Sequence, residues 1–419
     1  MAKVKFDNTK RHARLVTKGE DLEYLFSMTE EDACKLSVMM DCFGDFGSGP
    51  RFNPYDLVEV PAGKFGPEGM KNKNQFTTTV GLWVFNKAFI EPDLVPLLGY
   101  VNTPITKKQF KKLNKKISYA VIEDDLSLEA MKKFIIKTQK FQPYCNILSP
   151  SFTPNMFKIS DAVSSKKDEL FKKYEKELSN NDPATSQAIE KELIDLSKDL
   201  LKDDPSIDMI ESGAKADWGN NFSNVFVMRG AVKEADPSKG RNYSIIKGNY
   251  LDGVKPEEYA AFADSLTGGP YARAKKTEVG GYIEKTFVKA FEHIKVLPEG
   301  TDCHTKKTIT VTLDSGNIEM WMYSYVVEGN TLTEITSKNM NKFIGKTVKL
   351  RFSALCESKE GICSKCAGSL FNRINITNVG IATYNMASVM KNISMKSFHD
   401  STVKMQKMSD YGYKKIFGI

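Results

Sequence analysis

The sequence lacks any run of about 18 apolar residues, which a helix needs to cross a membrane. Residues 1–14 are polar and charged, unlike the apolar core of a secretory signal peptide. Histidine is scarce, with four in the chain, and no two are spaced as a metal-binding pair. Neither a Gly-x-Ser-x-Gly motif nor a phosphate-binding loop ending in Gly-Lys-Ser/Thr is present. We therefore expect no membrane span, no secretory leader and no common hydrolase site.

The charge of the chain is only mildly basic. Lys and Arg number 60 against 52 Asp and Glu, which gives a net charge of +8. This excess permits a polyanionic partner but does not require one. Apolar residues make up 41% and charged residues 27% of the 419 residues, so we expect a globular protein of two to four domains.

Cysteine gives the strongest local signal. An odd count of seven, without a secretory leader, argues against a disulfide framework. Cys363 and Cys366 are separated by two residues, so one turn can aim both thiolates at one point, and Cys356 lies one hairpin away. Zinc takes four tetrahedral ligands, and the fourth is Cys303 or its neighbour His304, with Cys303 favoured; four protein ligands make a structural site. The other cysteines are expected to be buried apolar side chains: Cys34, Cys42 and Cys145.

Periodic patterns predict several helices in the first half of the chain. We expect a helix at 29–40, a loop at 44–54 and a short helix at 79–89. Two narrow apolar stripes in 163–204 predict an antiparallel helical hairpin that projects from the body, with Asp182 as N-cap and Pro183 opening its second helix. Residues 101–119 predict a helix with a basic face, for which a solvated surface is the favoured interpretation. Its lysines are Lys107, Lys108, Lys111, Lys112, Lys115 and Lys116.

Residues 258–294 are the longest helical candidate. The pairs Gly268–Gly269 and Gly280–Gly281 lie inside it, and glycine pairs weaken and bend a helix. Such a helix suits a segment that flexes or lies close to a ligand; two shorter helices with a turn at Gly268 are the alternative.

Residues 306–355 predict β-structure. We expect strands at 308–313 and 318–327, joined by a hairpin turn at 314–317. A further strand at 347–352 would lead directly into Cys356.

The segment 378–399 has an unusual helical face. Asn392, Met395, Lys396 and His399 lie at i, i+3, i+4 and i+7, so a helix would present all four together. This face is poor for a core but suits a nucleotide, with the thioether against a base, the amide at a ribose hydroxyl and both basic groups at phosphates. A solvated helix is the alternative.

Taken in chain order, these segments resemble the largest, β′-type subunit of multisubunit DNA-dependent RNA polymerases. Residues 78–81, 101–102 and 107–108 resemble the segment leading to the secondary-channel rim, and the 163–204 hairpin resembles the rim coiled coil. The four cysteines match the family's second zinc site in order and spacing pattern. The resemblance covers roughly residues 29–405.

The resemblance also assigns candidate functional residues. Residues 212–230 resemble the F-loop region, residues 276–283 the bridge helix, and residues 395–399 the nucleotide-reading helix of the trigger loop. The implied nucleotide- or nucleic-acid-binding residues are Lys215, Asn221, Asn224, Arg229, Lys276, Thr277, Gly281 and Tyr282. The implied catalytic residues are Asn392, Met395, Lys396 and His399.

The family's magnesium-binding Asn-Ala-Asp-Phe-Asp-Gly-Asp loop is absent from the sequence. The chain therefore resembles the C-terminal part of a split β′ subunit, as in giant (jumbo) bacteriophages, beginning just after that loop and stopping soon after the trigger loop.

Several positions depart from the family pattern. Lys215 and Lys396 stand where the family has arginine, which keeps the charge but loses the planar fork. Asn392 is shorter than the family's glutamine, and Glu278 replaces a small residue after the bridge-helix Lys-Thr pair. Pro270 suggests that the regular bridge helix starts there.

The implied reaction is template-directed nucleotidyl transfer, in which the RNA 3′-hydroxyl attacks the α-phosphate of a nucleoside triphosphate and pyrophosphate leaves. Mg²⁺ would be held by aspartates of a partner chain, while one Zn²⁺ is structural. Implied partners are the β′ N-terminal chain, β-type chains, a phage promoter-specificity subunit, template DNA and nascent RNA, with no membrane. The complex would work in the cytoplasm of the infected host or be packaged in the virion.

We expect an α+β, multi-module fold that is mainly helical with one β-rich zinc module. The rival interpretation is a zinc-containing nucleic-acid-binding or structural virion protein without catalysis. It explains the cysteines and the charge but not the face formed by Met395 and His399. The expected regions are an active-site-proximal region at 1–100, a funnel-like region at 101–162, the rim hairpin at 163–204, the F-loop region at 205–257, the bridge helix at 258–296, the zinc module at 297–377, and the trigger loop with the C-terminus at 378–419.

Overall fold

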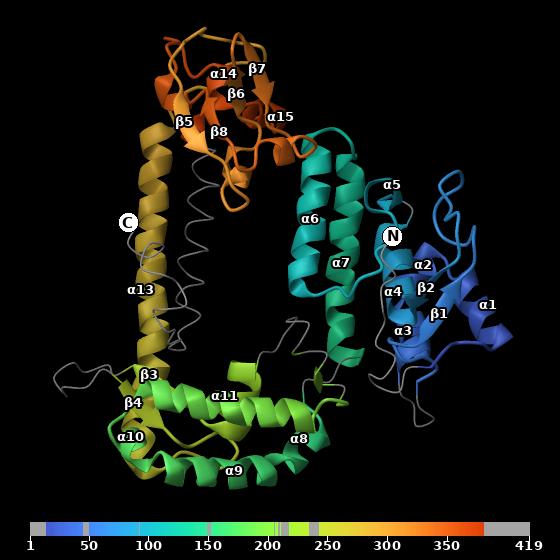
Figure 1. Ribbon diagram of the computed structural model, residues 1–419, viewed down its shortest axis with the longest axis vertical. Helices are drawn as coiled ribbons and strands as arrows, with labels where there is room; N and C mark the ends of the chain where they lie inside the picture. The colour runs from blue at the N-terminus through green and yellow to red at the C-terminus, as the bar shows by residue number, and fades with distance from the viewer. Residues whose placement is uncertain are drawn as a thin grey trace. The chain divides into compact units, whose positions relative to one another are not determined.

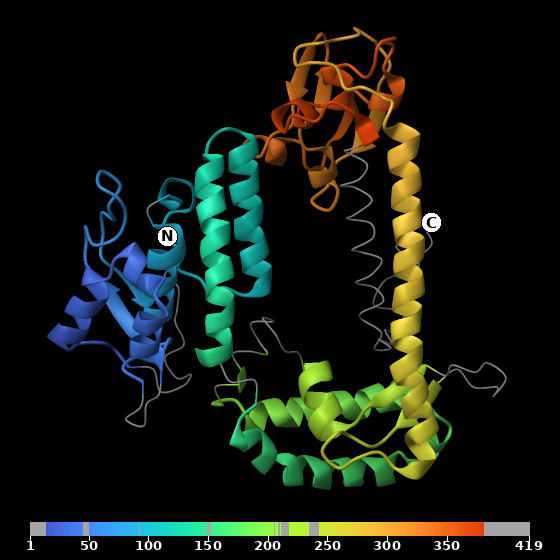
Figure 2. The same ribbon diagram turned by 180° about the vertical axis from the view of Figure 1, so that it is seen from behind.

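The computed structural model describes residues 14–44, 50–91, 93–148, 152–204, 206–207, 210, 218–233 and 243–380. These residues form two compact units, one ending at Asp264 and the other beginning at Ser265 (Figures 1 and 2). The described chain is mainly helical with three small sheets, which confirms the coarse fold class. The unit boundary falls inside the expected bridge-helix region, and the seven-part division stays a prediction.

Residues 14–148 surround one apolar core with helices and a two-stranded antiparallel sheet. Trp83 is fully buried there, and its Nε1 donates to the Leu25 carbonyl at 2.8 Å. The side chain of Asn86 is also buried and hydrogen-bonds both backbone groups of Val101 at 2.8 Å, which ties the following loop to the core. The elements are α1 (Gly19–Ser27), α2 (Glu30–Ala33), α3 (Leu36–Phe43), β1 (Leu57–Val60), β2 (Phe76–Thr79), α4 (Val80–Phe85), η2 (Asn86–Ile90), α5 (Val95–Leu98), α6 (Lys107–Ile122) and α7 (Leu128–Leu148).

The helices predicted in this region are present, with one interruption. The 29–40 stretch forms α2 and α3, because a capping box between Thr29 and Asp32 starts α2 and the chain is extended at Lys35. The 79–89 helix is confirmed as α4 continued by the π-helical η2, with Thr79 as N-cap. The basic helix is confirmed as α6.

The antiparallel helices predicted in 163–204 are confirmed and belong to a second core, while their projection from the body stays a prediction. Asp182 accepts hydrogen bonds from the Ala184 and Thr185 amides, and Pro183 is the first residue of the second helix, as predicted. Most residues of the apolar stripes are buried or half-buried and pack with η3, although Leu200 is 46% exposed, so this core covers the hairpin on one side. Figure 1 shows the long helices of the hairpin side by side. The elements are α8 (Pro154–Lys158), α9 (Ser160–Lys173), α10 (Glu175–Ser179), α11 (Pro183–Leu200), η3 (Trp218–Val227), β3 (Gly230–Lys233) and β4 (Tyr243–Ile246).

The long helix α13 runs without a break from Tyr259 to Phe291, preceded by the 3-10 turn η5 (Pro256–Glu258). The alternative of two helices with a turn at Gly268 is therefore wrong. The expectation that the regular helix starts at Pro270 is also wrong, because the helix begins eleven residues earlier. Proline removes one N–H donor, and the continuous helix tolerates that loss here. No α13 side chain that the structure describes is buried.

The second unit contains a four-stranded antiparallel sheet with the order β5-β8-β6-β7 (Figure 1). The predicted hairpin between 308–313 and 318–327 is wrong, because β5 (Ile309–Thr312) pairs with β8 (Thr347–Leu350). The hairpin instead joins β6 (Tyr325–Glu328) to β7 (Thr331–Glu334). The strand predicted at 347–352 is confirmed as β8. The short helical elements are η6 (Ile318–Trp321), η7 (Met340–Lys342), η8 (Ser353–Leu355), α14 (Ser364–Ala367) and α15 (Leu370–Arg373).

The chain enters and leaves this sheet module at one place. Lys295 and Asn378 form an antiparallel bridge, and the Val296 amide donates to the Thr377 carbonyl at 2.8 Å. The Val379 amide donates to the Ile294 carbonyl at 2.9 Å, just after the end of α13. The segment that leads into residue 381 thus starts beside the end of α13.

Candidate functional site

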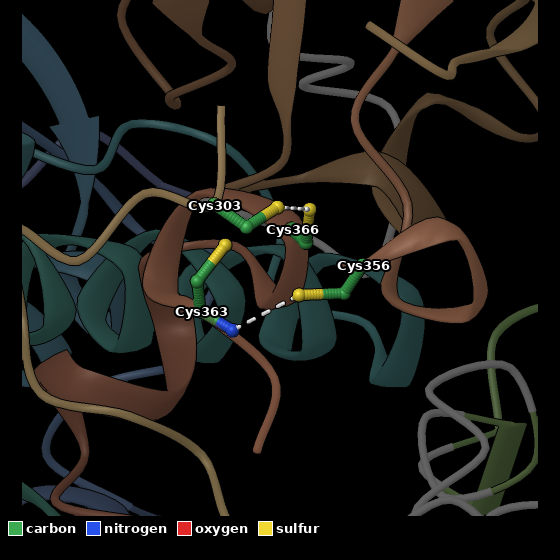
Figure 3. A group of neighbouring side chains, drawn as sticks. All are labelled: Cys303, Cys356, Cys363 and Cys366. Carbon is green, nitrogen blue, oxygen red and sulfur yellow. Dashed lines mark hydrogen bonds between the residues drawn. The ribbon is translucent and has the colours of Figure 1, made fainter. Parts of the chain in front are cut away.

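The four predicted zinc ligands converge at one point of the second unit. The sulfur atoms of Cys303, Cys356, Cys363 and Cys366 all lie within 4.8 Å of one another (Figure 3). The Sγ atoms of Cys303 and Cys366 are 3.7 Å apart. Sulfur ligands at about 2.3 Å from a tetrahedral ion stand roughly 3.8 Å apart, so this donor set fits a metal of the zinc type.

Local structure brings these thiols together. Cys356 follows η8, Cys363 is the N-cap of α14, and Cys366 lies inside α14, so a short loop and one helical turn carry three sulfurs. Gly361 lets this loop pass close to the segment that follows α13, because a Cβ there would stand 2.6 Å from the Lys295 carbonyl oxygen. The φ of Gly361 is 152°, which also favours glycine.

The competing fourth ligand lies outside the cluster. His304 has 87% of its side chain exposed, and its Nδ1 lies 3.6 Å from Asp302 rather than at the sulfurs. Its φ of 56° belongs to the left-handed region. Cys303, the favoured alternative, is the residue that joins the other three.

Sequence reasoning missed Arg351, a buried cation at the sulfur cluster. Its exposure is 5%, and its Nη2 lies 3.3 Å from the Sγ atoms of both Cys303 and Cys366. The same atom donates to Asp302 Oδ1 at 2.6 Å. The only signal in the sequence is an arginine in the predicted strand that leads to Cys356, and nothing in the sequence indicates that its side chain reaches the sulfurs.

The thiols of the cluster differ in acidity. Burial raises the pKa of the Cys303 thiol, but the N–H groups of Glu357 and Thr305 and the neighbouring sulfurs outweigh it and lower that pKa to about 6. Burial raises the pKa of Cys356 and of Cys366. Contacts with Cys366 and Asp302 raise the pKa of Arg351 against the effect of its burial, so the guanidinium stays charged. An anionic sulfur beside three further thiols is the arrangement that a thiophilic cation needs.

Two residues of the F-loop-like segment lie together. Arg229 Nη1 donates to Asn224 Oδ1 at 3.1 Å, and the Arg229 amide donates to the Gly248 carbonyl at 2.9 Å. Asn224 is buried, and Arg229 Nε is buried without a hydrogen-bond partner among the described residues. Lys215 lies outside the described residues, as does the side chain of Asn221.

The bridge-helix candidates all lie on α13. Tyr282 is 73% exposed, Thr277 is half-buried, and an added Cβ at Gly281 would meet no heavy atom within 4 Å. Glu278 forms an exposed ion pair with Lys275 at 2.8 Å. The side chain of Lys276 is outside the described residues.

The four trigger-loop candidates lie outside the described residues: Asn392, Met395, Lys396 and His399. The described chain ends at Gly380, where an added Cβ would stand 2.7 Å from the Glu292 Cα. The segment therefore starts in close backbone contact with the residue that follows α13.

The two segments compared with the approach to the rim also meet. The Thr78 hydroxyl donates a hydrogen bond to Asn102 Oδ1 at 2.7 Å, and Asn102 Nδ2 donates to the Thr77 carbonyl at 2.9 Å. Of the basic face of α6, five lysines are exposed and Lys115 is half-buried, in keeping with a solvated surface.

The remaining cysteines do not join a cluster in the part of the chain that the structure describes. Cys42 is fully buried and Cys34 half-buried, which agrees with the expectation of apolar side chains, while the side chain of Cys145 is not described. Among the described helices, none is both long and apolar enough to cross a membrane.

Several curated proteins that are similar to this chain carry the same name. The DNA-directed RNA polymerase subunit β′ of Ureaplasma urealyticum is 24% identical over 86% of this chain and 33% of its own length. The subunits of that name from Acidothermus cellulolyticus and Mycoplasma capricolum are 23% and 24% identical, over 78% and 93% of this chain. The similarity supports the β′ family for this chain. The chain spans about one third of the length of these β′ subunits. No protein-family model matches the chain.

Proposed function

We propose that this chain is the C-terminal part of a split β′ subunit, in the multisubunit DNA-directed RNA polymerase of a giant bacteriophage. The observation that carries the proposal is the similarity of most of the chain to one third of the β′ subunits. Its chemistry would be nucleotidyl transfer to RNA on a DNA template. The chain acts in the cytoplasm of the infected host, with the partner chains and nucleic acids that the resemblance implies.

In this proposal α13 is the bridge helix. A helix with no buried described side chain and with glycines in its interior has room for nucleic acid and for other subunits around it. Thr277, Gly281 and Tyr282 then lie at the template, together with Lys276. The Asn224–Arg229 hydrogen bond supports an F-loop role, because it fixes a charged group at a turn.

The four-cysteine cluster is the proposed structural zinc site. Its sulfurs are close enough for one tetrahedral ion, and the protein fills every ligand position, which leaves no site for substrate. Mg²⁺ would be held by the aspartates of the partner chain and would supply Lewis-acid stabilisation of the reacting phosphates.

The proposed trigger loop follows Gly380. Met395 stacks on the incoming base, Asn392 contacts the ribose, and Lys396 and His399 face the phosphates. Such a segment closes over a correct nucleotide and aligns it, which is a gating step. The backbone contact of Gly380 with Glu292 supports this role, because it anchors one end of the segment beside α13.

The decisive experiment measures single-nucleotide addition by the assembled polymerase on a preformed RNA–DNA scaffold. We expect His399→Ala to slow addition by about 10- to 10³-fold, the range for one positioned proton or phosphate donor. Lys396→Ala acts in the same direction, and the double variant is less than additive, because both groups act in one closed state. His293→Ala, an exposed histidine after α13, is the matched control and keeps the wild-type rate.

Two outcomes contradict the proposal at different levels. If His399→Ala adds nucleotides at the wild-type rate, the role assigned to residues 392–399 is wrong. If the chain never joins a complex that synthesises RNA, the rival zinc-containing binding or virion protein is correct.

A further inference from the structure

The four sulfurs of the cluster have unequal surroundings. Arg351 contacts three of them, at 3.3 Å to Cys303 and Cys366 and at 4.0 Å to Cys363. Cys356 is absent from these contacts, and its Sγ accepts the Cys363 backbone N–H at 3.4 Å, as Figure 3 shows. One side of the cluster is therefore held by a guanidinium and the other by a backbone amide.

Arg351 is fixed where it stands. Its side chain is nearly fully buried, its Nη2 bonds Asp302, and its backbone amide donates to the Tyr325 carbonyl at 2.9 Å within the sheet. Four thiolates around a divalent ion leave an excess of negative charge, which a buried cation offsets. N–H groups that point at metal-bound sulfurs also make those sulfurs poorer nucleophiles and poorer bases.

The fourth thiol, Cys356, borders a pocket; the residue is half-buried, as Cys303 is. Cys356 lines a pocket of about 280 Å³ together with Ser353, Ser358, Lys359 and Gly361. Cys363 and Cys366 are buried, and neither they nor Cys303 line this pocket. A chelator or an incoming ion that uses the pocket meets Cys356 first.

We propose that Cys356 is the exchangeable ligand of the metal site, through which the ion is loaded and released, while Arg351 holds the other three thiolates in place. This inference rests on the proposed zinc site. Three of the four ligands, Cys303, Cys363 and Cys366, stay bound to the ion, while Cys356 dissociates from it. Exchange begins when the Cys356 sulfur leaves the ion and a sulfur or nitrogen donor from solvent takes its position.

Limited alkylation of the full-length wild-type chain tests the order directly. The Zn²⁺-loaded protein is treated with substoichiometric iodoacetamide, and each cysteine is quantified by mass spectrometry. We expect Cys356 to be labelled first among the four and metal loss to follow its labelling. Equal labelling of the four, or labelling of Cys303 first, overturns the proposal without any variant that could misfold.

Two serine variants test the same asymmetry through the metal. We expect Cys356→Ser to keep one Co²⁺ with the absorption of a three-thiolate site, and to release Zn²⁺ to a chelator at least about tenfold faster than wild type. Cys363→Ser, the matched control on the Arg351 side, should retain no metal under the same conditions. Equal retention by the two variants contradicts the inference.

Arg351→Lys tests the holding role. It keeps the charge but loses the forked N–H contacts to two sulfurs, so we expect chelator release to quicken by about 10- to 100-fold and alkylation to spread to Cys303 and Cys366. The control is Arg373→Lys, which alters an ion pair with Glu334 in the same unit and should change neither readout. If Arg351→Lys releases Zn²⁺ to the chelator at the wild-type rate, Arg351 does not hold the three thiolates in place. A wild-type chain that binds no metal refutes the zinc proposal itself, which is a distinct result.

Discussion

Asp204 is a buried carboxylate that organises the start of the second core. It accepts hydrogen bonds from Thr153 and Asn155 at the beginning of α8, and from the Ser206 amide and hydroxyl at 2.9 and 2.5 Å. Burial raises the pKa of Asp204, but the bonds from Ser206, Asn155 and Thr153 outweigh it and lower that pKa below its usual value. The ionised form is therefore the one that the fold stabilises.

We expect Asp204→Asn to lower the free energy of unfolding at pH 7 by about 1–3 kcal/mol, because hydrogen bonds to a charged acceptor are lost. A carboxyl whose folded pKa is depressed stabilises the fold above its unfolded pKa of about 3.9, and that contribution fades as pH falls further. The variant should therefore lose less stability than wild type below about pH 4. Urea unfolding of the full chain at pH 7 and below about pH 4 measures the free energy of unfolding of both proteins.

Asp199→Asn is the control for Asp204→Asn, since Asp199 is exposed on α11. An equal loss of stability in the two variants, or an unchanged acid dependence, would contradict the role given to Asp204.

At the scale of residues, local chemistry could be predicted and long-range contacts could not. The cap at Asp182–Pro183 follows from neighbours in the sequence, and the structure has it as expected. The cysteine cluster follows from spacing plus the limited chemistry of thiolates. Arg351 could not be foreseen, because its side chain reaches the sulfurs only once β8 has paired with β5 and β6, far away in the sequence.

At the scale of elements, the misassigned hairpin shows how two turns compete. Asp314 accepts hydrogen bonds from the Gly316 and Asn317 amides, and the Ile318 amide bonds the Asp314 carbonyl, so the chain continues as the 3-10 turn η6. The actual hairpin turns at Gly329–Asn330, where Gly329 has a φ of 62°. A Gly-Asn pair between strands is a strong hairpin signal. It lies just beyond the predicted strand at 318–327, where no turn was predicted.

Helix α13 carries a prediction at the same scale. Gly281→Ala has room for its methyl group and should stabilise the helix by about 0.5–1 kcal/mol. If bending at the glycine pair accompanies translocation, multi-nucleotide elongation on the scaffold slows by about two- to fivefold, as that energy implies. Lys285→Ala, an exposed change on the same helix, is the control and should leave elongation unchanged. Wild-type elongation by Gly281→Ala would show that bending there is not required.

At the scale of the molecule, the exposed apolar side chains of α13 call for partners. Tyr271 and Tyr282 are 72% and 73% exposed, and Val279, Ile283 and Phe287 are exposed as well. A helix without packing opens locally at low cost, so its amides exchange hydrogen readily. In the proposed polymerase other chains and nucleic acid cover this helix.

We therefore expect assembly to slow hydrogen exchange along α13, by about tenfold for each 1.4 kcal/mol of new packing. Hydrogen exchange with mass spectrometry compares the chain alone with the active complex. Helix α11, which already buries Ile189 and Leu193, serves as the internal reference and should change little. The chain alone should make no RNA. Unaltered exchange of α13 in an active complex would refute its role as the bridge helix.

The bridge between Lys295 and Asn378 has a consequence for the history of the chain. The segment between these two residues contains the whole sheet and the four cysteines. Its first and last residues lie side by side in one antiparallel pair. Strands in such a pair are about 5 Å apart, a gap that a two-residue turn can span. The module is thus a cassette that can be gained, lost or transplanted with little disturbance to its point of attachment. A related chain that dispenses with the metal could shed the whole cassette and keep α13 joined to the segment after it.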